Sequence, residues 1–408
     1  MDQQTNRDQL EVIELLKKNN VFLTGPAGTG KTFTVEQVAK YFKNLNVYIT
    51  ATTGIAAQNY ENATTLHSFA GIPTYQSKLS HFIQNLHPFI KERLKDVNLL
   101  IIDEVSMLNV ETFELLNGLL KFAKNSGKHF GGCRLLLTGD FFQLPPVLKN
   151  EFGLLLFESE LWKNANIITK HSTQNYRQDK DSEYQQHLFN IREGDIPPFT
   201  LKYFLNRSYE QVTFKKSYLK VFFTNNETNN YNQKRLQELP GNLITYNAIV
   251  TSFNYPLHDW SFQIPKQVTL KVGARVMISK NFIDKNLVNG HIATIVHLED
   301  NLITIKYKKM FIDLMLPIET ILNNKQEKVA ECKGFPLVLA YGLTVHKVQG
   351  LTLNHVVIYL NKLQFTPHLF YVAASRVTNG QNIYLIGNNE FTIQFLNNIK
   401  ILPQVFHF

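Results

Sequence analysis

Residues 25–32 read Gly-Pro-Ala-Gly-Thr-Gly-Lys-Thr, which fits the phosphate-binding pattern G-x-x-x-x-G-K-[ST] at every required position. The apolar run 21–23 predicts a strand that leads into this loop, and the helical spacing of apolar residues in 33–42 predicts a helix that leaves it. A strand, a glycine turn and a helix start surround an anion with backbone N–H groups. Lys31 would reach the β- and γ-phosphates, and Thr32 would offer a hydroxyl to Mg²⁺. The loop therefore predicts a nucleoside triphosphate site rather than a chance glycine-rich turn.

Two acidic residues follow the next buried strand that the sequence predicts. Residues 99–102 read Leu-Leu-Ile-Ile, and Asp103 and Glu104 come directly after them. Because consecutive residues of a strand point to opposite faces, the two carboxylates would serve different roles. We expect Asp103 to hold Mg²⁺ and Glu104 to take the proton from the attacking water; the alternative is a solvated acidic pair. A further apolar strand at 134–139 precedes Gln143, a candidate sensor of the γ-phosphate.

Hydroxyl and aromatic side chains near two further strand ends point to a second anionic ligand. The segment 51–57 carries Thr53 and Gly54 before a helix start, which can hold a phosphate of a nucleic-acid backbone. The segment 64–71 adds His67 and Phe69, whose rings can stack on bases, and Phe69 is the best candidate for stacking. Upstream of the loop, Gln9 can read an adenine edge with its amide. For each of these residues ordinary packing remains the alternative.

The length, composition and charge of the chain limit the kinds of protein that it can be. A chain of 408 residues with 44% hydrophobic residues can form several hydrophobic cores, and its length predicts roughly two to four structural units. A net charge of +9 favours a polyanionic partner. Two cysteines without a C-x-x-C spacing argue against a disulfide framework or a zinc site and fit a reducing compartment. No apolar run is long enough to span a bilayer and no targeting signal is visible, so we expect a soluble cytoplasmic, nucleoid or nuclear protein.

The second half of the chain repeats the α/β plan without a second phosphate loop. Short alternating segments beginning near residue 284 predict a small all-β insertion. The polar, basic stretch 73–95 predicts a second, smaller excursion from the first domain. The α/β elements predicted around the insertion are strands at 218–224, 355–360 and 382–387 and helices at 227–239 and 367–376.

The order of these motifs resembles that of the Pif-type DNA helicases, in the RecD-like branch of superfamily one. Residues 25–32 resemble the first motif of that family, and 101–108 and 137–147 resemble its second and third. Asn175-Tyr176-Arg177-Gln178 stands where the family carries an arginine finger. Residues 341–352 resemble the motif that grips DNA and couples it to ATP, and 371–376 resemble the last motif, whose arginine meets the γ-phosphate.

The resemblance implies an α/β fold with two RecA-like P-loop domains in tandem, a small wedge insertion and an SH3-like β insertion. The implied limits are 1–168 for the first RecA-like domain with its wedge at 73–95, 169–283 with 339–408 for the second, and 284–338 for the β insertion. If both domains must contact the γ-phosphate, Arg177 and Arg376 have to lie near Lys31. An arginine supplied in this way raises the rate because charge develops on the transferred phosphoryl group.

The resemblance also implies the residues of each site. The catalytic residues would be Lys31, Glu104, Gln143, Arg177 and Arg376. The nucleotide would be bound by Gln9, Gly25, Pro26, Ala27, Gly28, Thr29, Gly30, Lys31, Thr32 and Gly350, with Thr32 and Asp103 on Mg²⁺. DNA would be bound by Thr53, Gly54, His67, Ser68, Phe69, Thr224, Asn225, His346 and Lys347.

We therefore expect an ATP- and Mg²⁺-dependent helicase that moves 5′ to 3′ on single-stranded DNA and unwinds duplexes; the direction rests on the resemblance alone. The implied partners are single-stranded and forked DNA, with G-quadruplexes as a further candidate, and the implied state is a monomer acting in replication, repair, recombination or telomere maintenance. Two alternatives stay open: an RNA-directed helicase of the same superfamily, because backbone tracking barely distinguishes the sugars, and a catalytically silent nucleic-acid-binding scaffold. A P-loop kinase or GTPase is disfavoured because no guanine-reading N-K-x-D segment is present.

Overall fold

The computed structural model describes residues 7–405 apart from 58, 73–78, 80–82, 84–85, 147–153, 179, 211–213, 215–217, 253–261, 263, 281, 283–284, 286, 288–289, 323–327, 361–367, 400 and 403. The chain forms two compact units, Met1–Tyr218 with Val348–Phe408, and Leu219–Lys347. These units do not coincide with the domain limits expected from the sequence, which stay predictions. Of the wedge predicted at 73–95, residues 73–78, 80–82 and 84–85 lie outside the described residues. Within the described part of the chain, no helix is long and apolar enough to cross a membrane.

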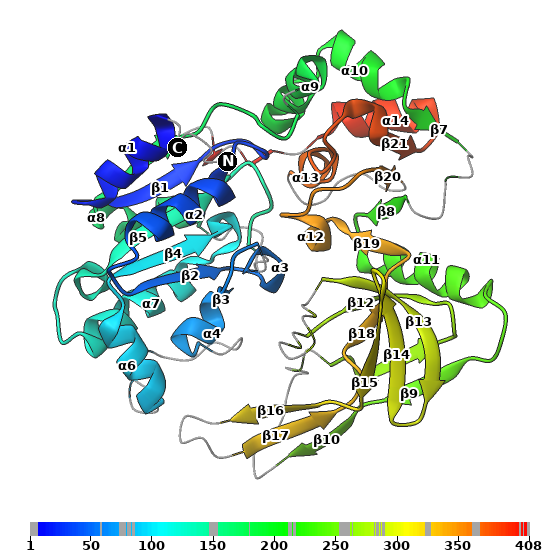
Figure 1. Cartoon of the computed structure of the whole chain (residues 1–408). Helices are drawn as coiled ribbons and strands as arrows, with labels where there is room; N and C mark the ends of the chain where they lie inside the picture. Colours follow the sequence, from blue (N-terminus) through cyan, green and yellow to red (C-terminus); the bar gives the residue numbers. More distant parts are fainter. Residues whose placement is uncertain are drawn as a thin grey trace. The chain divides into compact units, whose positions relative to one another are not determined.

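The first unit is built on a six-stranded parallel sheet in the order β3-β2-β4-β5-β1-β6 (Figure 1). An all-parallel sheet is covered by helices on both faces, which is why its strands read as continuous apolar runs. This is the α/β, RecA-like architecture expected from the sequence. The strands are β1 (Asn20–Thr24), β2 (Val47–Ala51), β3 (Thr64–Thr65), β4 (Leu99–Asp103), β5 (Arg134–Gly139) and β6 (Ile167–His171).

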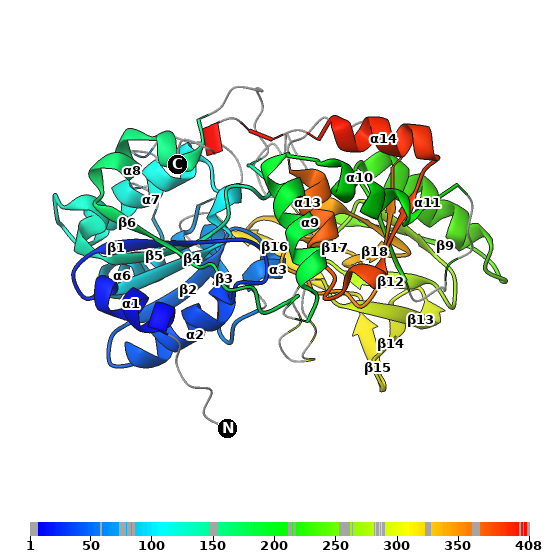
Figure 2. The same cartoon turned by 90° about the horizontal axis from the view of Figure 1, so that it is seen from above.

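Alternate residues of the central strands enter two different cores. Leu99 and Ile101 of β4 pack with α1 (Arg7–Leu16) and α2 (Lys31–Tyr41), whereas Leu100 and Ile102 pack with α7 (Val110–Ala123). This follows from the period of two in a strand. Figure 2 shows α2 and α7 on opposite faces of the sheet. The same unit contains α3 (Gly54–Ala57), α4 (Leu66–Ala70), α6 (Pro88–Asp96), α8 (Glu160–Asn164), α9 (Ser182–Glu193), α10 (Pro198–Leu205), α13 (Leu369–Ala374) and α14 (Asn389–Asn397).

Three loops of this unit meet at one edge of the sheet. Because β1, β4 and β5 are parallel neighbours, with Thr24 beside Gly139 and Ile102 beside Leu137, their carboxyl ends lie together. Ligands of open parallel sheets bind outside these ends. The segments at these ends are residues 25–30, 103–104 and 140–143, and all three carry predicted site residues. The unit also holds a parallel ladder of β20 (Val356–Tyr359), β21 (Ile383–Ile386) and β7 (Ser208–Tyr209).

The second unit is mostly antiparallel. β8 (Leu219–Phe222) pairs in parallel with β19 (Gly342–Thr344), and α11 (Asn225–Gln237) and α12 (Val345–Val348) follow them in the chain. A five-stranded antiparallel sheet has the order β15-β14-β13-β12-β18. Its strands are β12 (Arg275–Ile278), β13 (Ile292–Glu299), β14 (Leu302–Tyr307), β15 (Met310–Met315) and β18 (Leu337–Leu339). Smaller ladders join β9 (Ile244–Asn247) to β11 (Gln267–Leu270), and β10 (Ile249–Ser252) to β17 (Lys328–Lys333) and β16 (Ile318–Leu322).

The antiparallel region is longer than the insertion expected at 284–338. It reaches from β9 to β18: β12 bonds to both β13 and β18, and side chains of β9 and β11 pack into the same core as those of β12. Burial alternates along β13 and β14, so one face of this sheet forms a core and the other faces solvent. The α/β elements predicted for the second half of the chain are confirmed as β8, α11, β20, α13 and β21.

Candidate functional site

The nucleotide loop, residues 25–30, connects β1 to α2. Gly30 caps α2 with a φ of 79°, and Gly28 has a φ of 89°, in the left-handed region that glycine favours. A Cβ atom on Gly28 would lie 2.6 Å from Cβ of Arg177, so only glycine permits this approach. The backbone N–H of Tyr176 donates to the Gly28 carbonyl at 2.8 Å. The loop is thus shaped as an anion cradle, and the predicted arginine finger lies against it.

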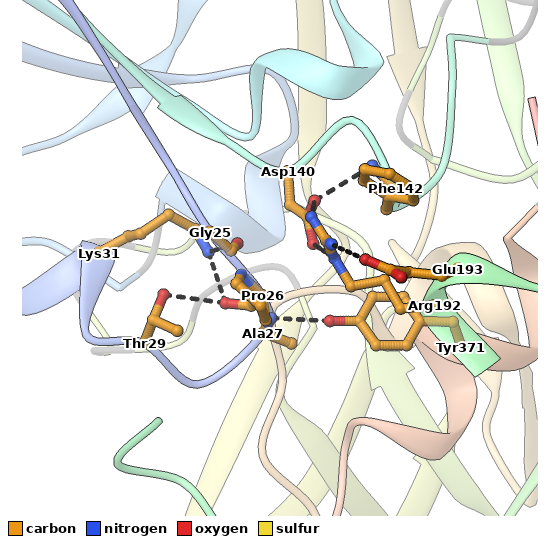
Figure 3. Close-up of polar contacts among 10 residues, drawn as sticks. All are labelled: Gly25, Pro26, Ala27, Thr29, Lys31, Asp140, Phe142, Arg192, Glu193 and Tyr371. Atoms are coloured by element: carbon orange, nitrogen blue, oxygen red, sulfur yellow. Dashed lines mark hydrogen bonds and ion pairs between the residues drawn. The ribbon is translucent and has the colours of Figure 1, made fainter. Parts of the chain in front are cut away.

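Lys31 lies among carboxylates at this edge of the sheet. Its Nζ donates to the carbonyl oxygens of Gly25 at 2.7 Å and Pro26 at 2.9 Å (Figure 3). Burial lowers its pKa, and the carboxylates of Asp140, Glu104 and Asp103 oppose that shift in this order. An ammonium group in this position is suited to neutralise phosphate oxygens above the loop.

The predicted magnesium ligands share a hydrogen-bonding neighbour. The hydroxyl of Tyr60 donates to Oδ2 of Asp103 at 2.6 Å, and the side chain of Thr32 lies close enough to affect the pKa of the Tyr60 phenol. Oδ1 of Asp103 accepts from the hydroxyl of Thr138 and, at 2.9 Å, from the backbone N–H of Glu104. A hydroxyl and an oriented carboxylate beside a phosphate cradle fit the oxygen ligands of Mg²⁺. We infer that Thr32 and Asp103 would hold the ion.

Glu104 has the surroundings of a base. It adopts a left-handed φ of 56°, which is uncommon for a residue other than glycine and often marks a functional position. Burial and then the charge of Asp103 raise the pKa of its carboxyl group, while Lys31 and Arg376 oppose the shift. Nε2 of Gln349 donates to its Oε2 at 3.1 Å. A raised pKa makes the carboxylate a better acceptor for the proton of an attacking water.

Arg177 and Arg376 lie near Lys31 and Glu104. Arg376 is 1% exposed, and burial together with the charge of Arg177 lowers its pKa to about 9, against the opposing carboxylate of Glu104. The charge of Arg177 also contributes to the lowered pKa of Lys31. Arg376 is therefore a buried group of the site and not part of a surface ion pair. Two guanidinium groups beside Lys31 could stabilise negative charge that develops on a transferred phosphoryl group.

Gln143 and Gly350 also lie at this site. Gln143 is 3% exposed, and its Oε1 has no hydrogen-bond partner in the part of the chain that the structure describes. A buried polar atom without a hydrogen-bond partner lowers stability. Such an atom fits an amide that binds a ligand or a water molecule. A Cβ on Gly350 would lie 4.0 Å from Oε1 of Glu104, so its backbone is close to the base. Gln9 is buried in α1 and is 7% exposed.

Two further residues of the site had no predicted role. Asp140 follows β5, and its carboxylate accepts from Arg192 of α9 at 2.8 Å (Figure 3). The guanidinium of Arg192 also lies 3.9 Å from the ring centroid of Phe142. Burial alone would raise the pKa of Asp140, but the charge and hydrogen bond of Arg192 outweigh it and the net shift is downward. The position of Asp140 after a central parallel strand, like that of Asp103, is the signal that could have identified it.

Comparison with known proteins identifies the family of this chain. Residues 2–199 match the PIF1-like helicase family model, and residues 284–385 match that of the viral superfamily 1 RNA helicase core domain. The ATP-dependent DNA helicase Pif1 of Campylobacter jejuni is 30% identical, over 98% of this chain and 96% of its own length. The chain belongs to the PIF1-like helicase family. The human ATP-dependent DNA helicase PIF1 is 28% identical over 99% of this chain, which spans 63% of the human protein.

Solved structures of Pif1 helicases resemble this PIF1-like helicase over nearly its whole length. The crystal structure of the Candida albicans Pif1 helicase superimposes with a TM-score of 0.85 at 28% identity and covers 98% of each chain. A Bacteroides Pif1 helicase in complex with ADP-AlF3 and single-stranded DNA gives 0.82 at 26% identity, covering 100% of this chain and 96% of that one.

One predicted DNA contact of this PIF1-like helicase is wrong. Phe69 of α4 is fully buried, and its ring packs 5.1 Å from that of Tyr48 and 5.0 Å from the guanidinium of Arg93. Nη2 of Arg93 donates to the carbonyl oxygens of Ser68, at 2.8 Å, and Phe69. The ring belongs to the core and cannot stack on a base. The helical period places it inward, whereas Ser68 is exposed and His67 is half-buried.

The remaining predicted DNA contacts lie at helix starts. In the first unit, Oγ1 of Thr53 accepts from the N–H of Ala56 at 3.2 Å, and Gly54 begins α3. In the second unit, Thr224 caps α11, and its Oγ1 accepts from the N–H of Glu227 at 3.3 Å. In the structure these two threonines therefore act as local helix caps.

A polar groove in the second unit brings two of the predicted DNA contacts together. Asn225 and Lys347 both line a groove of about 300 Å³. Thr344 and Gln267 add further polar groups to its wall, and His346 is half-buried next to Lys347. A cation among amides and hydroxyls suits a phosphate backbone.

Proposed function

We propose that this chain uses ATP hydrolysis at the nucleotide loop to move 5′ to 3′ along single-stranded DNA and to separate the duplex ahead of it. As a member of the PIF1-like family it is an ATP-dependent DNA helicase. The observation that carries the mechanism is the gathering of Lys31, Glu104, Arg177 and Arg376 at one edge of the parallel sheet. A binding scaffold would not need two arginines there.

We assign a role in hydrolysis to each of these groups. Lys31 and the loop amides hold the β- and γ-phosphates, Glu104 takes the proton of the attacking water, and both arginines stabilise the charge of the transition state. Mg²⁺, held by Thr32 and Asp103, would supply charge neutralisation between the phosphates. Gln143 contacts the γ-phosphate with its amide and reports its presence.

Alternate tightening and release of two DNA grips would convert this chemistry into movement. In one unit the candidates are Thr53, Gly54, His67 and Ser68; in the other they are Thr224, Asn225, His346 and Lys347. Contacts of this kind reach the phosphate backbone and tolerate any sequence. We expect the protein to act inside the cell as a monomer on single strands and forks, and G-quadruplexes are a further substrate to test.

A strand-displacement assay tests substrate, energy source and direction together. Forked DNA with a 5′ tail should be unwound in the presence of ATP and Mg²⁺, whereas DNA with a 3′ tail should not. Lys31→Ala should abolish ATPase activity and unwinding but retain strand binding, because the grips are elsewhere. Unwinding of the 3′-tailed substrate alone would overturn the direction, and normal turnover by Lys31→Ala would overturn the nucleotide site.

An RNA substrate is the second candidate, because residues 284–385 match a viral superfamily 1 RNA helicase core. A protein that moves along the phosphate backbone hardly distinguishes ribose from deoxyribose. Stimulation of ATPase activity by DNA and RNA oligomers of equal length decides between them, and we expect DNA to stimulate more strongly.

A further inference from the structure

A buried tyrosine of α13 bonds directly to the nucleotide loop. Tyr371 is 2% exposed, and its hydroxyl oxygen accepts from the backbone N–H of Ala27 at 2.9 Å. Figure 3 shows the phenol reaching the loop beside the Arg192–Asp140 pair. Burial and then the charge of Asp140 raise the pKa of the phenol to about 12, so it stays neutral. A buried N–H that loses its acceptor destabilises the arrangement that contains it.

The C-terminal end of α13 and its cap also bond to the two arginines of the site. Nε of Arg376 donates to the Val372 carbonyl and its Nη2 donates to the Ser375 hydroxyl, both at 2.8 Å. Nη1 of Arg177 donates to the Ser375 carbonyl at 3.1 Å. Arg376 is therefore anchored to α13 and to Ser375, the C-cap of this helix, so its position relative to the loop follows that of α13. Arg177 bonds to the same cap through its guanidinium group, but its backbone N–H also donates to the Gly28 carbonyl of the loop at 3.3 Å.

From these two connections we propose that Tyr371 is a positioning residue for hydrolysis: its bond to Ala27 sets the distance between the loop and Arg376, which directly follows the C-cap of α13. This inference rests on the proposed ATPase function. The bond uses one N–H of the loop and leaves Lys31, Thr32 and the amides from Gly28 onward untouched. Nucleotide binding should therefore survive its loss, while the chemical step should not.

A second buried tyrosine of the same unit provides a matched control. Tyr184 of α9 is fully buried, and its hydroxyl donates to the carbonyl oxygen of Ala374 at 2.8 Å. It anchors the same helix with a bond of nearly the same length and has no hydrogen bond to the loop. Tyr184→Phe and Tyr371→Phe thus remove the same chemical group from the two sides of α13.

The test compares both variants in DNA-stimulated ATPase assays and in binding of a non-hydrolysable ATP analogue. Tyr371→Phe should lower kcat about tenfold or more, with KM and analogue affinity within about threefold of wild type. Tyr184→Phe should lower the melting temperature about as much as Tyr371→Phe does. Its kcat should nevertheless stay within about threefold of wild type. Equal loss of kcat in both variants, or unchanged kcat in Tyr371→Phe, would overturn the proposal.

A double mutant separates positioning from general loosening of the fold. If Tyr371 acts through Arg376, the kcat of Tyr371→Phe combined with Arg376→Ala should be within about threefold of that of Arg376→Ala alone, because residues acting as a unit are not additive. If the fold losses in kcat of the two single variants multiply in the double variant, the proposal is overturned. Absence of DNA-stimulated turnover in the wild type would instead contradict the proposed function, so the two failures can be told apart.

Discussion

At the scale of single residues, burial explains most of the unusual properties of the site. Arg376, Asp140 and His368 are each 1% exposed or less, and all three lie within or beside the ion-pair network around the nucleotide loop. A buried charge persists only when neighbours compensate for lost hydration. Asp140 has such a neighbour in Arg192, and it is ionised. His368 instead avoids a buried charge by staying neutral.

His368 should make the protein sensitive to acid. Burial lowers its pKa from 6.5 to about 4, with Asp140 opposing and Arg192 assisting the shift. Between these two values the unfolded chain binds a proton that the folded chain does not, so stability is lost as pH falls below 6.5. The loss should reach roughly 2 kcal/mol at pH 5, since each pH unit corresponds to about 1.4 kcal/mol.

Thermal unfolding of wild type and His368→Asn between pH 7 and pH 5 measures this loss. Asparagine suits the position because His368 has a left-handed φ of 64°. The melting temperature of the variant should fall less over this range, whereas the exposed His129→Asn should follow wild type. Parallel curves for wild type and His368→Asn would contradict the assignment.

At the scale of elements, α9 is attached to the sheet edge by an ion pair that water hardly reaches. The side chains of Arg192 and Asp140 are 12% and 0% exposed. Attraction in a buried pair is offset by desolvation, but removal of one partner leaves the other uncompensated. The pair therefore fixes where α9 lies relative to the end of β5, although its net contribution to stability can be small.

Arg192→Met should destabilise the protein by about 3 kcal/mol, because it leaves the Asp140 carboxylate buried without its partner. Combining it with Asp140→Asn should recover part of the loss. Lys163→Met, which breaks the exposed pair with Glu160, should cost less than about 1 kcal/mol. Chemical denaturation of the wild type and these three variants measures the differences, and equal costs for Arg192→Met and Lys163→Met would contradict the interpretation.

At the scale of the whole molecule, the positive charge agrees with a polyanionic ligand. The net charge of +9 is spread over both units, and the groove that contains Lys347 is one candidate contact. Each phosphate that a cation neutralises releases counterions, so binding weakens with salt in proportion to the number of contacts.

Single-stranded DNA binding should show a linear fall of log K with log salt concentration. Lys347→Gln should weaken binding and make the slope shallower by about 0.7, the value for one phosphate contact on a single strand. Lys18→Gln removes the same charge from an exposed position beyond α1 and should leave the slope unchanged. Fluorescence anisotropy titrations measure both slopes, and equal slopes for wild type and Lys347→Gln would remove Lys347 from the DNA contact.

Local patterns in the sequence determine the strand, glycine loop and helix around Lys31, the carboxylates after β4 and the α/β order of the second half. These features depend on residues close together in the chain, so spacing alone predicts them. The tertiary structure decides which ring is buried and which distant groups meet. Phe69 enters the core, Arg192 pairs with Asp140, and Tyr371 bonds to Ala27 across 344 positions of sequence. No local period encodes such contacts, because they form only when separate elements pack together.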